Sequence, residues 1–213
     1  MTAGWFEPVR RRWLLYHLTD PHFAFMYDPP PPGEWVAVDC ETTGLDVHRD
    51  EIISIGAVRI VGNRLLTSEK LEMLVRPERR RLKADSVRVH GLREQDVAQG
   101  IKPEEAMRRF LEFIGSRPLV GYFLEFDVAM LNREIWRLLG VRLPQPKIEV
   151  SAMYYDYRNR QLPSHLQGGA IDLRFATMMS DLALPMRGAH DALNDAVMAG
   201  LAFVKLRHLV DVR

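Results

Sequence analysis

The sequence predicts an α/β fold in which helices flank one mixed central sheet. From residue 34 onward the chain shows short runs rich in β-branched residues, separated by turn residues, which indicates a meander of strands. Further along, short apolar runs alternate with segments whose apolar residues recur at helical spacing. A meander followed by alternating strands and helices is typical of a layered α/β domain with a single mixed sheet.

Each element has its own support in the sequence. Gly62 and Asn63 form the turn after the second strand, and Met107, Phe110 and Ile114 share one face of the first helix. The expected strands cover residues 35–39, 51–61, 71–75, 118–122 and 147–150, and the expected helices cover residues 103–114, 126–139, 173–182 and 191–209.

The composition predicts one globular domain with an appendage. A chain of 213 residues with 47% hydrophobic and 27% charged residues can bury one sizeable core. The proline-rich run DPPPPG at residues 28–33 is stiff and cannot join a helix, so we expect an N-terminal extension over residues 1–33 and the main domain over residues 34–213. Residues 7–18 predict a short helix that either packs on the domain or serves as a docking or nucleic-acid arm.

Charge and cysteine content bear on the possible ligands and on the cellular location of the protein. The net charge of +1 gives no overall field that favours or excludes a nucleic-acid ligand. The single cysteine, Cys40, cannot form an intramolecular disulfide, and no segment has the pattern of a signal peptide or a membrane span. We therefore expect a soluble, cytoplasmic protein without membrane contact. A basic run at residues 76–83, RPERRRLK, is either a solvated loop or a phosphate-binding segment.

Two acids stand at the end of the first strand, in the stretch VAVDCETTGLD at residues 36–46. Asp39 and Glu41 are two residues apart and project from the same face, whereas Cys40 faces the other way. Such a pair is either solvated at a strand end or, if buried, requires a shared proton, a basic partner or a metal ion. The threonines that follow, with Gly44 free to adopt a positive φ, could present N–H and hydroxyl groups to an anionic ligand.

Further acids are placed where they could join this pair. Asp127 follows the expected strand at residues 118–122, at the strand edge where ligands collect in open α/β sheets, although a helix dipole alone would also favour an acid there. His190 and Asp195 are about 140° apart on a continuous helix, so they converge only if His190 precedes the helix and Asp191 caps it. Asp191 remains a rival of Asp195 for the site, and His190 on its own could be an ordinary loop histidine.

Together these motifs resemble a known family. D-x-E-T-T-G-L at residues 39–45, F-D at residues 126–127 and H-D-A-L-N-D-A at residues 190–196 resemble, in order, the three motifs of the DEDDh, or DnaQ-like, 3′–5′ exonucleases. The bacterial polymerase III proofreading subunit and its stand-alone relatives belong to this family. V-H-G-L at residues 89–92 is similar to a fourth family segment, and the resemblance covers about residues 34–209.

The resemblance implies a ribonuclease H-like fold, a five-stranded mixed sheet whose first three strands are antiparallel. It implies that the general base is His190 and that the metal-binding carboxylates are Asp39, Glu41, Asp127 and Asp195. The residues that it places around the terminal nucleotide are Thr42, Thr43, Gly44 and Leu45, with His90 nearby. The chain departs from the family's H-N-x-x-F-D pattern, because Tyr122 and Phe123 replace the polar pair; these aromatics either stack on a base or pack in the core.

The chemistry of these residues is consistent with the resemblance. Four hard oxygen donors suit two divalent cations, Mg²⁺ or Mn²⁺, rather than zinc. An imidazole acting as base predicts a rate that rises from mildly acidic to mildly alkaline pH. The expected substrates are 3′ ends of single-stranded DNA or RNA, with DNA favoured, and the N-terminal extension is a candidate docking arm for a protein partner. The alternative is a non-catalytic nucleic-acid-binding or scaffold module with the same fold.

Overall fold

A computed structural model describes residues 14–79, 84–186, 188 and 190–211 and confirms the expected mixed sheet. The five strands lie in the order β3-β2-β1-β4-β5. The first three strands pair antiparallel, whereas β4 pairs parallel with both β1 and β5. The strands are β1 (Glu34–Thr42), β2 (Ile52–Val61), β3 (Arg64–Leu74), β4 (Leu119–Gly121) and β5 (Lys147–Glu149).

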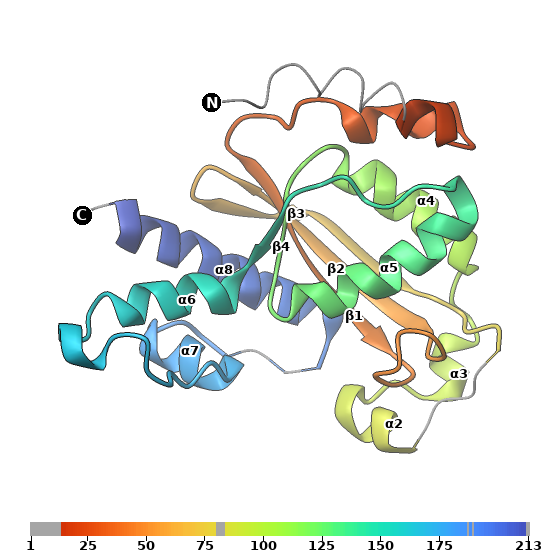
Figure 1. Cartoon of the computed structure of the whole chain (residues 1–213). Helices are drawn as coiled ribbons and strands as arrows, with labels where there is room; N and C mark the ends of the chain where they lie inside the picture. Colours follow the sequence, from red (N-terminus) through yellow and green to blue (C-terminus); the bar gives the residue numbers. More distant parts are fainter. Residues whose placement is uncertain (1–13, 80–83, 187, 189, 212–213) are drawn as a thin grey trace.

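Helices cover both faces of the sheet (Figure 1). On one face lie η1, α4 and α5, and on the other lie α6, α7 and α8. The helices are η1 (Pro21–Tyr27), α2 (Ala84–His90), α3 (Glu94–Val97), α4 (Pro103–Ile114), α5 (Leu124–Leu139), α6 (Val150–Asn159), η2 (Ser164–Leu166), α7 (Phe175–Asp181) and α8 (Ala192–Asp211).

The alternation of side chains along β1 divides the core into two layers. Val36, Val38 and Cys40 are buried with the side chains of α4 and α5. Ala37 is buried on the opposite face, with the side chains of α6, α7 and α8. Because strand residues two apart share a face, the odd-numbered residues that follow Ala37 must also face α8.

The structure adds elements that the sequence pattern does not reveal. β3 begins at Arg64 rather than at residue 71, because its first half is an exposed, polar edge strand that reads as a loop. α6 follows β5 directly and is capped by the side chain of Glu149, which accepts a hydrogen bond from Ser151 N. The helices η1, α2 and α3 are short, so they contain too few turns to show a clear period.

The described residues of the expected N-terminal extension pack against the rest of the chain. Residues 14–17 are helical, and the side chains of Leu18, Phe23 and Met26 are buried in the same core as α4 and α5. The first half of the expected helix at residues 7–18, and residues 80–83 of the basic run, lie outside the described residues. Across the described chain, every helix is too short or too polar to cross a membrane.

Candidate metal centre

The two acids of β1 point towards α8. Asp39 and Glu41 follow Ala37 on the face that α8 covers, and Cys40 between them is buried on the face of α4 and α5. Burial raises the pKa of the Cys40 thiol well above its usual value, so the thiol stays protonated. Cys40 is therefore a poor metal ligand in both its direction and its protonation state.

Asp127 reaches the same end of β1 from α5. It lies in the first turn of this helix, just after β4, and its side chain is 4% exposed. Its Oδ1 accepts a hydrogen bond of 3.1 Å from the backbone N–H of Cys40. This bond fixes the Asp127 carboxylate beside the residue that separates Asp39 from Glu41.

Asp195 is positioned by the start of α8. Asp191 precedes this helix, and its side chain accepts a hydrogen bond of 2.8 Å from Asn194 N, which is an N-cap contact. His190 adopts a left-handed backbone conformation with φ of 67°, and its backbone N–H donates a bond of 3.0 Å to Asp195 Oδ2. Asp191 thus serves the helix end, and His190 lies in the preceding loop beside Asp195.

A glycine allows α8 to approach the strand so closely. Gly56 on β2 is the register partner of Asp39. A Cβ atom built on Gly56 would lie 2.2 Å from the backbone of Ala192 and Leu193 in the first turn of α8. Only a residue without a side chain leaves room for that helix end, so Gly56 brings Asp195 within reach of Asp39.

Gly56→Ala is expected to push the start of α8 away from β2. We expect a loss of about 1–3 kcal/mol in the free energy of unfolding, as for other overpacked core positions. Mn²⁺ affinity should fall as well, because the displaced helix carries Asp195. Urea unfolding and Mn²⁺ titration of the variant check both effects, and a variant with normal stability and normal Mn²⁺ affinity would show that the close contact is unimportant.

Three carboxylates come together in the folded chain. Asp39, Glu41 and Asp195 each offer an oxygen within 4.8 Å of the others. Asp195 Oδ1 is buried, and no hydrogen-bond partner for it exists in the part of the chain that the structure describes. Such an orphaned oxygen among repelling acids is the environment that a divalent cation would relieve, so the residues fit a Mg²⁺ or Mn²⁺ site.

The carboxyl groups hold protons unusually tightly in the metal-free state. Burial and then the charges of Asp127 and Asp195 raise the pKa of Asp39 well above its ordinary value. Burial and the neighbouring acids raise the pKa of Glu41 to about 7. Burial raises the pKa of Asp127 to about 8, although the Cys40 N–H acts in the opposite direction. Burial also raises the pKa of Asp195, against the opposing effect of the His190 N–H and imidazole.

These raised pKa values predict an unusual pH dependence of stability. Between the ordinary carboxyl pKa of about 4 and the folded values for Glu41 and Asp127, the native state binds more protons than the unfolded state. The free energy of unfolding in EDTA should therefore fall as the pH rises from about 4 to about 8. Urea unfolding across this range measures the slope.

Mn²⁺ provides the control for this pH dependence. At the alkaline end it should restore the lost stability, because bound cations favour the ionised carboxylates of the folded state. Glu41→Gln should make the slope in EDTA smaller, since this variant has one fewer group to titrate. A metal-free protein whose stability rises over the same range would contradict the assigned environment of these acids.

In the segment at and after the end of β1, two threonines hold the loop together and one leucine is exposed on the surface. The buried Thr43 hydroxyl donates to Asp50 and accepts from Glu51 N, so this side chain holds the loop together. The Thr42 hydroxyl donates to the Gly44 carbonyl at 2.7 Å. Leu45, in contrast, is 84% exposed. Leu45 is therefore the side chain of this segment that is most free to meet a ligand.

His90 lies near His190. Its side chain is buried, and its Nδ1 accepts a hydrogen bond of 3.1 Å from Leu92 N. Burial, and then the charge of His190, lower the pKa of His90. The structure thus places both histidines of the sequence motifs on the same side of the molecule, whereas neither imidazole belongs to the cluster of three carboxylates.

Two aromatic residues replace the polar pair of the resembling family, and the structure separates their roles. The Tyr122 hydroxyl donates to the Leu173 carbonyl, and its ring packs on Phe175. Phe123 is 65% exposed and adopts a left-handed conformation with φ of 53°. Tyr122 therefore belongs to the core, and Phe123 presents its ring to the surface.

The sequence did not indicate a role for Glu149, although its carboxylate binds the starts of two helices at this edge of the sheet. Its carboxylate accepts hydrogen bonds from the backbone N–H groups of Phe123 and Leu124 at the start of α5, and from Ser151 at the start of α6. One acid thus caps two helix ends. No local sequence signal indicates this contact, because Glu149 is far along the chain from Phe123.

Comparison with known proteins identifies similar chains. A family model described as Exonuclease matches residues 36–203. A DNA polymerase III subunit epsilon-like protein of Rhodobacter capsulatus is 33% identical over 176 residues, which are 81% of this chain and 23% of that protein. The DNA polymerase III subunit epsilon of Aquifex aeolicus is 26% identical over 191 residues, which are 88% of this chain and 87% of that protein. The chain thus spans about a quarter of the first relative and most of the second.

Solved structures share the fold. A zinc-bound complex of E. coli ExoI with single-stranded DNA superposes with a TM-score of 0.69 at 17% identity, covering 85% of this chain and 43% of that one. The cell-death related nuclease CRN-4 gives a TM-score of 0.64 at 16% identity, covering 84% of this chain and 64% of that one. At these identities the likeness concerns the fold alone.

Proposed function

The chain belongs to the exonuclease family, of the DnaQ-like 3′–5′ type, and from this premise we propose that it removes nucleotides from the 3′ ends of single-stranded nucleic acid. The observation that carries the proposal is the convergence of Asp39, Glu41 and Asp195 within 4.8 Å of one another. A family member that had lost catalysis would have no need to keep these half-buried, mutually repelling carboxylates together.

In the proposed mechanism the carboxylates from three elements would hold two divalent cations. Asp39 and Glu41 from β1 and Asp195 from α8 would bind them, and Asp127, fixed by the Cys40 N–H, would complete the ligand set. When bound, the cations would lower the pKa of an attacking water and stabilise the leaving 3′-oxygen. His190, in the loop before α8, would accept the proton of that water.

A cavity at the first turn of α5, the turn that carries Asp127, supports binding of a terminal nucleotide. Its volume is about 510 Å³, and it is lined by Leu45, Phe123, Phe126 and Glu149, among others. Leu45 and Phe123 are exposed apolar side chains, which can contact the face of a base without selecting its identity. Thr42, Gly44 and His90 are proposed to complete this site, together with the backbone of Thr43.

We favour DNA over RNA as the substrate. The relatives at 33% and 26% identity are named as subunits or subunit-like proteins of DNA polymerase III. One structure with the same fold contains single-stranded DNA. These names support a DNA substrate for this chain. Its protein partners must be identified by experiment.

The decisive experiment uses oligonucleotides labelled at the 5′ end. The protein is incubated with matched single-stranded DNA and RNA in Mg²⁺, in Mn²⁺ or in EDTA. Stepwise shortening from the 3′ end, faster on DNA and abolished by EDTA, is expected. Intact oligonucleotides in every cation would contradict the proposal and would favour a non-catalytic nucleic-acid-binding module.

A further inference from the structure

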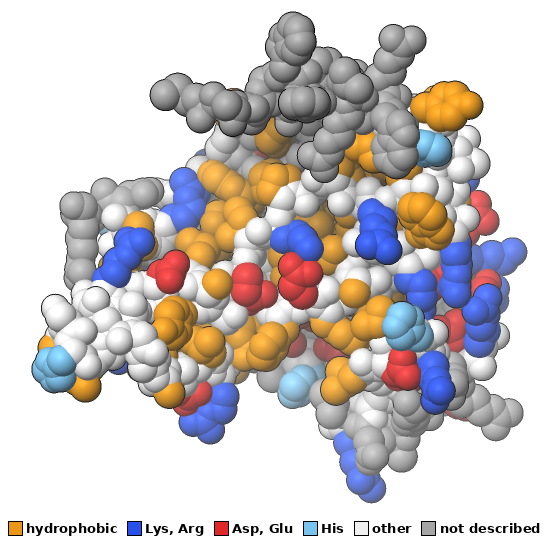
Figure 2. Space-filling model, in the orientation of Figure 1, with side chains coloured by type: hydrophobic (Ala, Val, Ile, Leu, Met, Phe, Trp, Pro, Cys, Tyr) orange, Lys and Arg blue, Asp and Glu red, His pale blue; other side chains and the backbone are white. Residues whose placement is uncertain are grey.

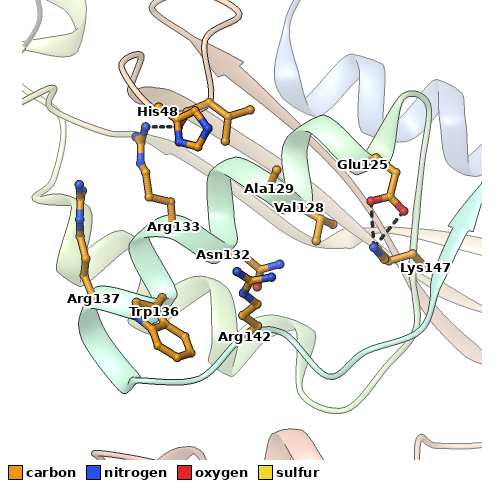
Figure 3. Close-up of a pocket in the computed structure, with 11 residues that line it drawn as sticks. His48, Glu125, Val128, Ala129, Asn132, Arg133, Trp136, Arg137, Arg142 and Lys147 are labelled. Atoms are coloured by element: carbon orange, nitrogen blue, oxygen red, sulfur yellow. Dashed lines mark hydrogen bonds and ion pairs between the residues drawn. The ribbon is translucent and has the colours of Figure 1, made fainter.

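A groove lies along the outer face of α5, apart from the carboxylate cluster (Figure 3). Its volume is about 480 Å³. Four cationic side chains and a tryptophan are among the residues that line it: Arg133, Trp136, Arg137, Arg142 and Lys147. We refer to it as the α5 groove.

The α5 groove adjoins the cavity at the first turn of α5. Glu125 lines both hollows, and Asp127 lies in the same turn. Glu125, Asn132 and Trp136 follow one another at helical spacing and share one face of the helix. At about 1.5 Å per residue, this face extends roughly 16 Å from Glu125 to Trp136.

The charges of the groove leave a surplus of positive charge. Arg133 and Arg137 both bind the carboxylate of Glu134, and Lys147 binds Glu125. Arg142 is exposed and has no carboxylate partner among the described residues. Four cations thus face two acids. Lys and Arg side chains gather on the surface over α5 in Figure 2.

Trp136 adds an aromatic surface to these cations. Its side chain is 56% exposed, which is unusual for so large an apolar group. The segment that carries Arg142 is held close to α5, because Leu143 N donates a hydrogen bond of 2.8 Å to Asn132 Oδ1. The ring and the guanidinium are therefore presented from a fixed framework, as a strand with bases and phosphates requires.

We propose that the α5 groove binds the single-stranded segment that precedes the 3′ end in the active site. This inference rests on the proposed exonuclease function. Trp136 stacks on a base, while Arg142 and its neighbouring cations contact phosphates. Since stacked nucleotides repeat at about 3.4 Å per strand, the groove accommodates about five of them. Catalytic efficiency should therefore increase with substrate length up to that point.

The test compares a dinucleotide with a DNA oligonucleotide of about 12 nucleotides, which exceeds the proposed groove. The quantity measured is the ratio of kcat/KM on the long substrate to kcat/KM on the dinucleotide. Trp136→Ala should lower this ratio at least about fivefold, as expected for one lost base stack. Arg142→Gln should lower it too, and should reduce the salt dependence of log(kcat/KM) on the long substrate by about 0.7, as for one lost phosphate contact.

Arg64→Gln is the matched control, because Arg64 is exposed at the start of β3, outside the groove. This variant should keep the wild-type ratio. Equal ratios in the wild type and both groove variants would overturn the assignment of the groove alone. A wild-type protein that cleaves neither substrate would overturn the proposed function, and the role of the groove with it.

Discussion

Asp39→Asn is expected to lower the rate of nucleotide release at least about a thousandfold. This corresponds to about 4 kcal/mol of lost transition-state stabilisation, since each 1.4 kcal/mol costs about a factor of ten. Asp39 lies within the carboxylate cluster, and the charges of Asp127, Asp195 and Glu41 all raise its pKa. Asparagine keeps the size of the side chain and removes one ligand charge. Mn²⁺ affinity should therefore fall together with activity, which isothermal titration calorimetry and the oligonucleotide assay measure.

The same variant should be more stable than the wild type in EDTA. Replacing a buried, repelled carboxyl by a neutral amide removes the cost of ionising it, and this gain should grow as the pH rises above the ordinary carboxyl pKa of about 4. Asp156→Asn is the matched control, because Asp156 is exposed on α6, away from the cluster. An Asp39→Asn protein with wild-type metal affinity and turnover would refute the assigned role.

His190→Ala is expected to lower kcat by about 10²–10⁴-fold, the usual contribution of a general base. Metal affinity should remain close to that of the wild type. The structure gives the reason: the contact between His190 and Asp195 comes from the backbone N–H, which alanine retains. The substitution therefore removes the imidazole without releasing the carboxylate.

Single-turnover kinetics and Mn²⁺ titration separate these two effects. His208→Ala, on the exposed far end of α8, is the matched control and should behave as the wild type. Parallel loss of metal and activity in His190→Ala would mean that His190 acts on the metal site, and the division of roles between the histidine and the acids would be wrong.

The sequence was most informative where a periodic pattern and a chemical motif coincide. Strand alternation alone correctly placed Asp39 and Glu41 on one face with Cys40 on the other. The expected helix at residues 103–114 agrees with α4 residue for residue, because a proline marks its start and its apolar face is regular. Asp191 was likewise predictable as the cap of α8 from its residue type and position.

Contacts between distant segments could not be predicted in this way. Nothing in the local sequence distinguishes Gly56 from an ordinary strand glycine, although its missing side chain admits α8. The capping role of Glu149 and the α5 groove also depend on how separate loops meet. The sequence left two alternatives for Phe123, stacking on a base or packing in the core. In the structure its backbone is left-handed and its side chain is 65% exposed, so Phe123 does not pack in the core.

The most direct test of the central claim is anomalous diffraction from crystals soaked in Mn²⁺. Two peaks are expected within coordination distance of the carboxylates, one or both touching Asp39, with Glu41, Asp127 and Asp195 as further ligands. A well-ordered crystal without anomalous density at this cluster, or with Mn²⁺ bound elsewhere, would contradict the claim that these acids converge in order to hold divalent cations.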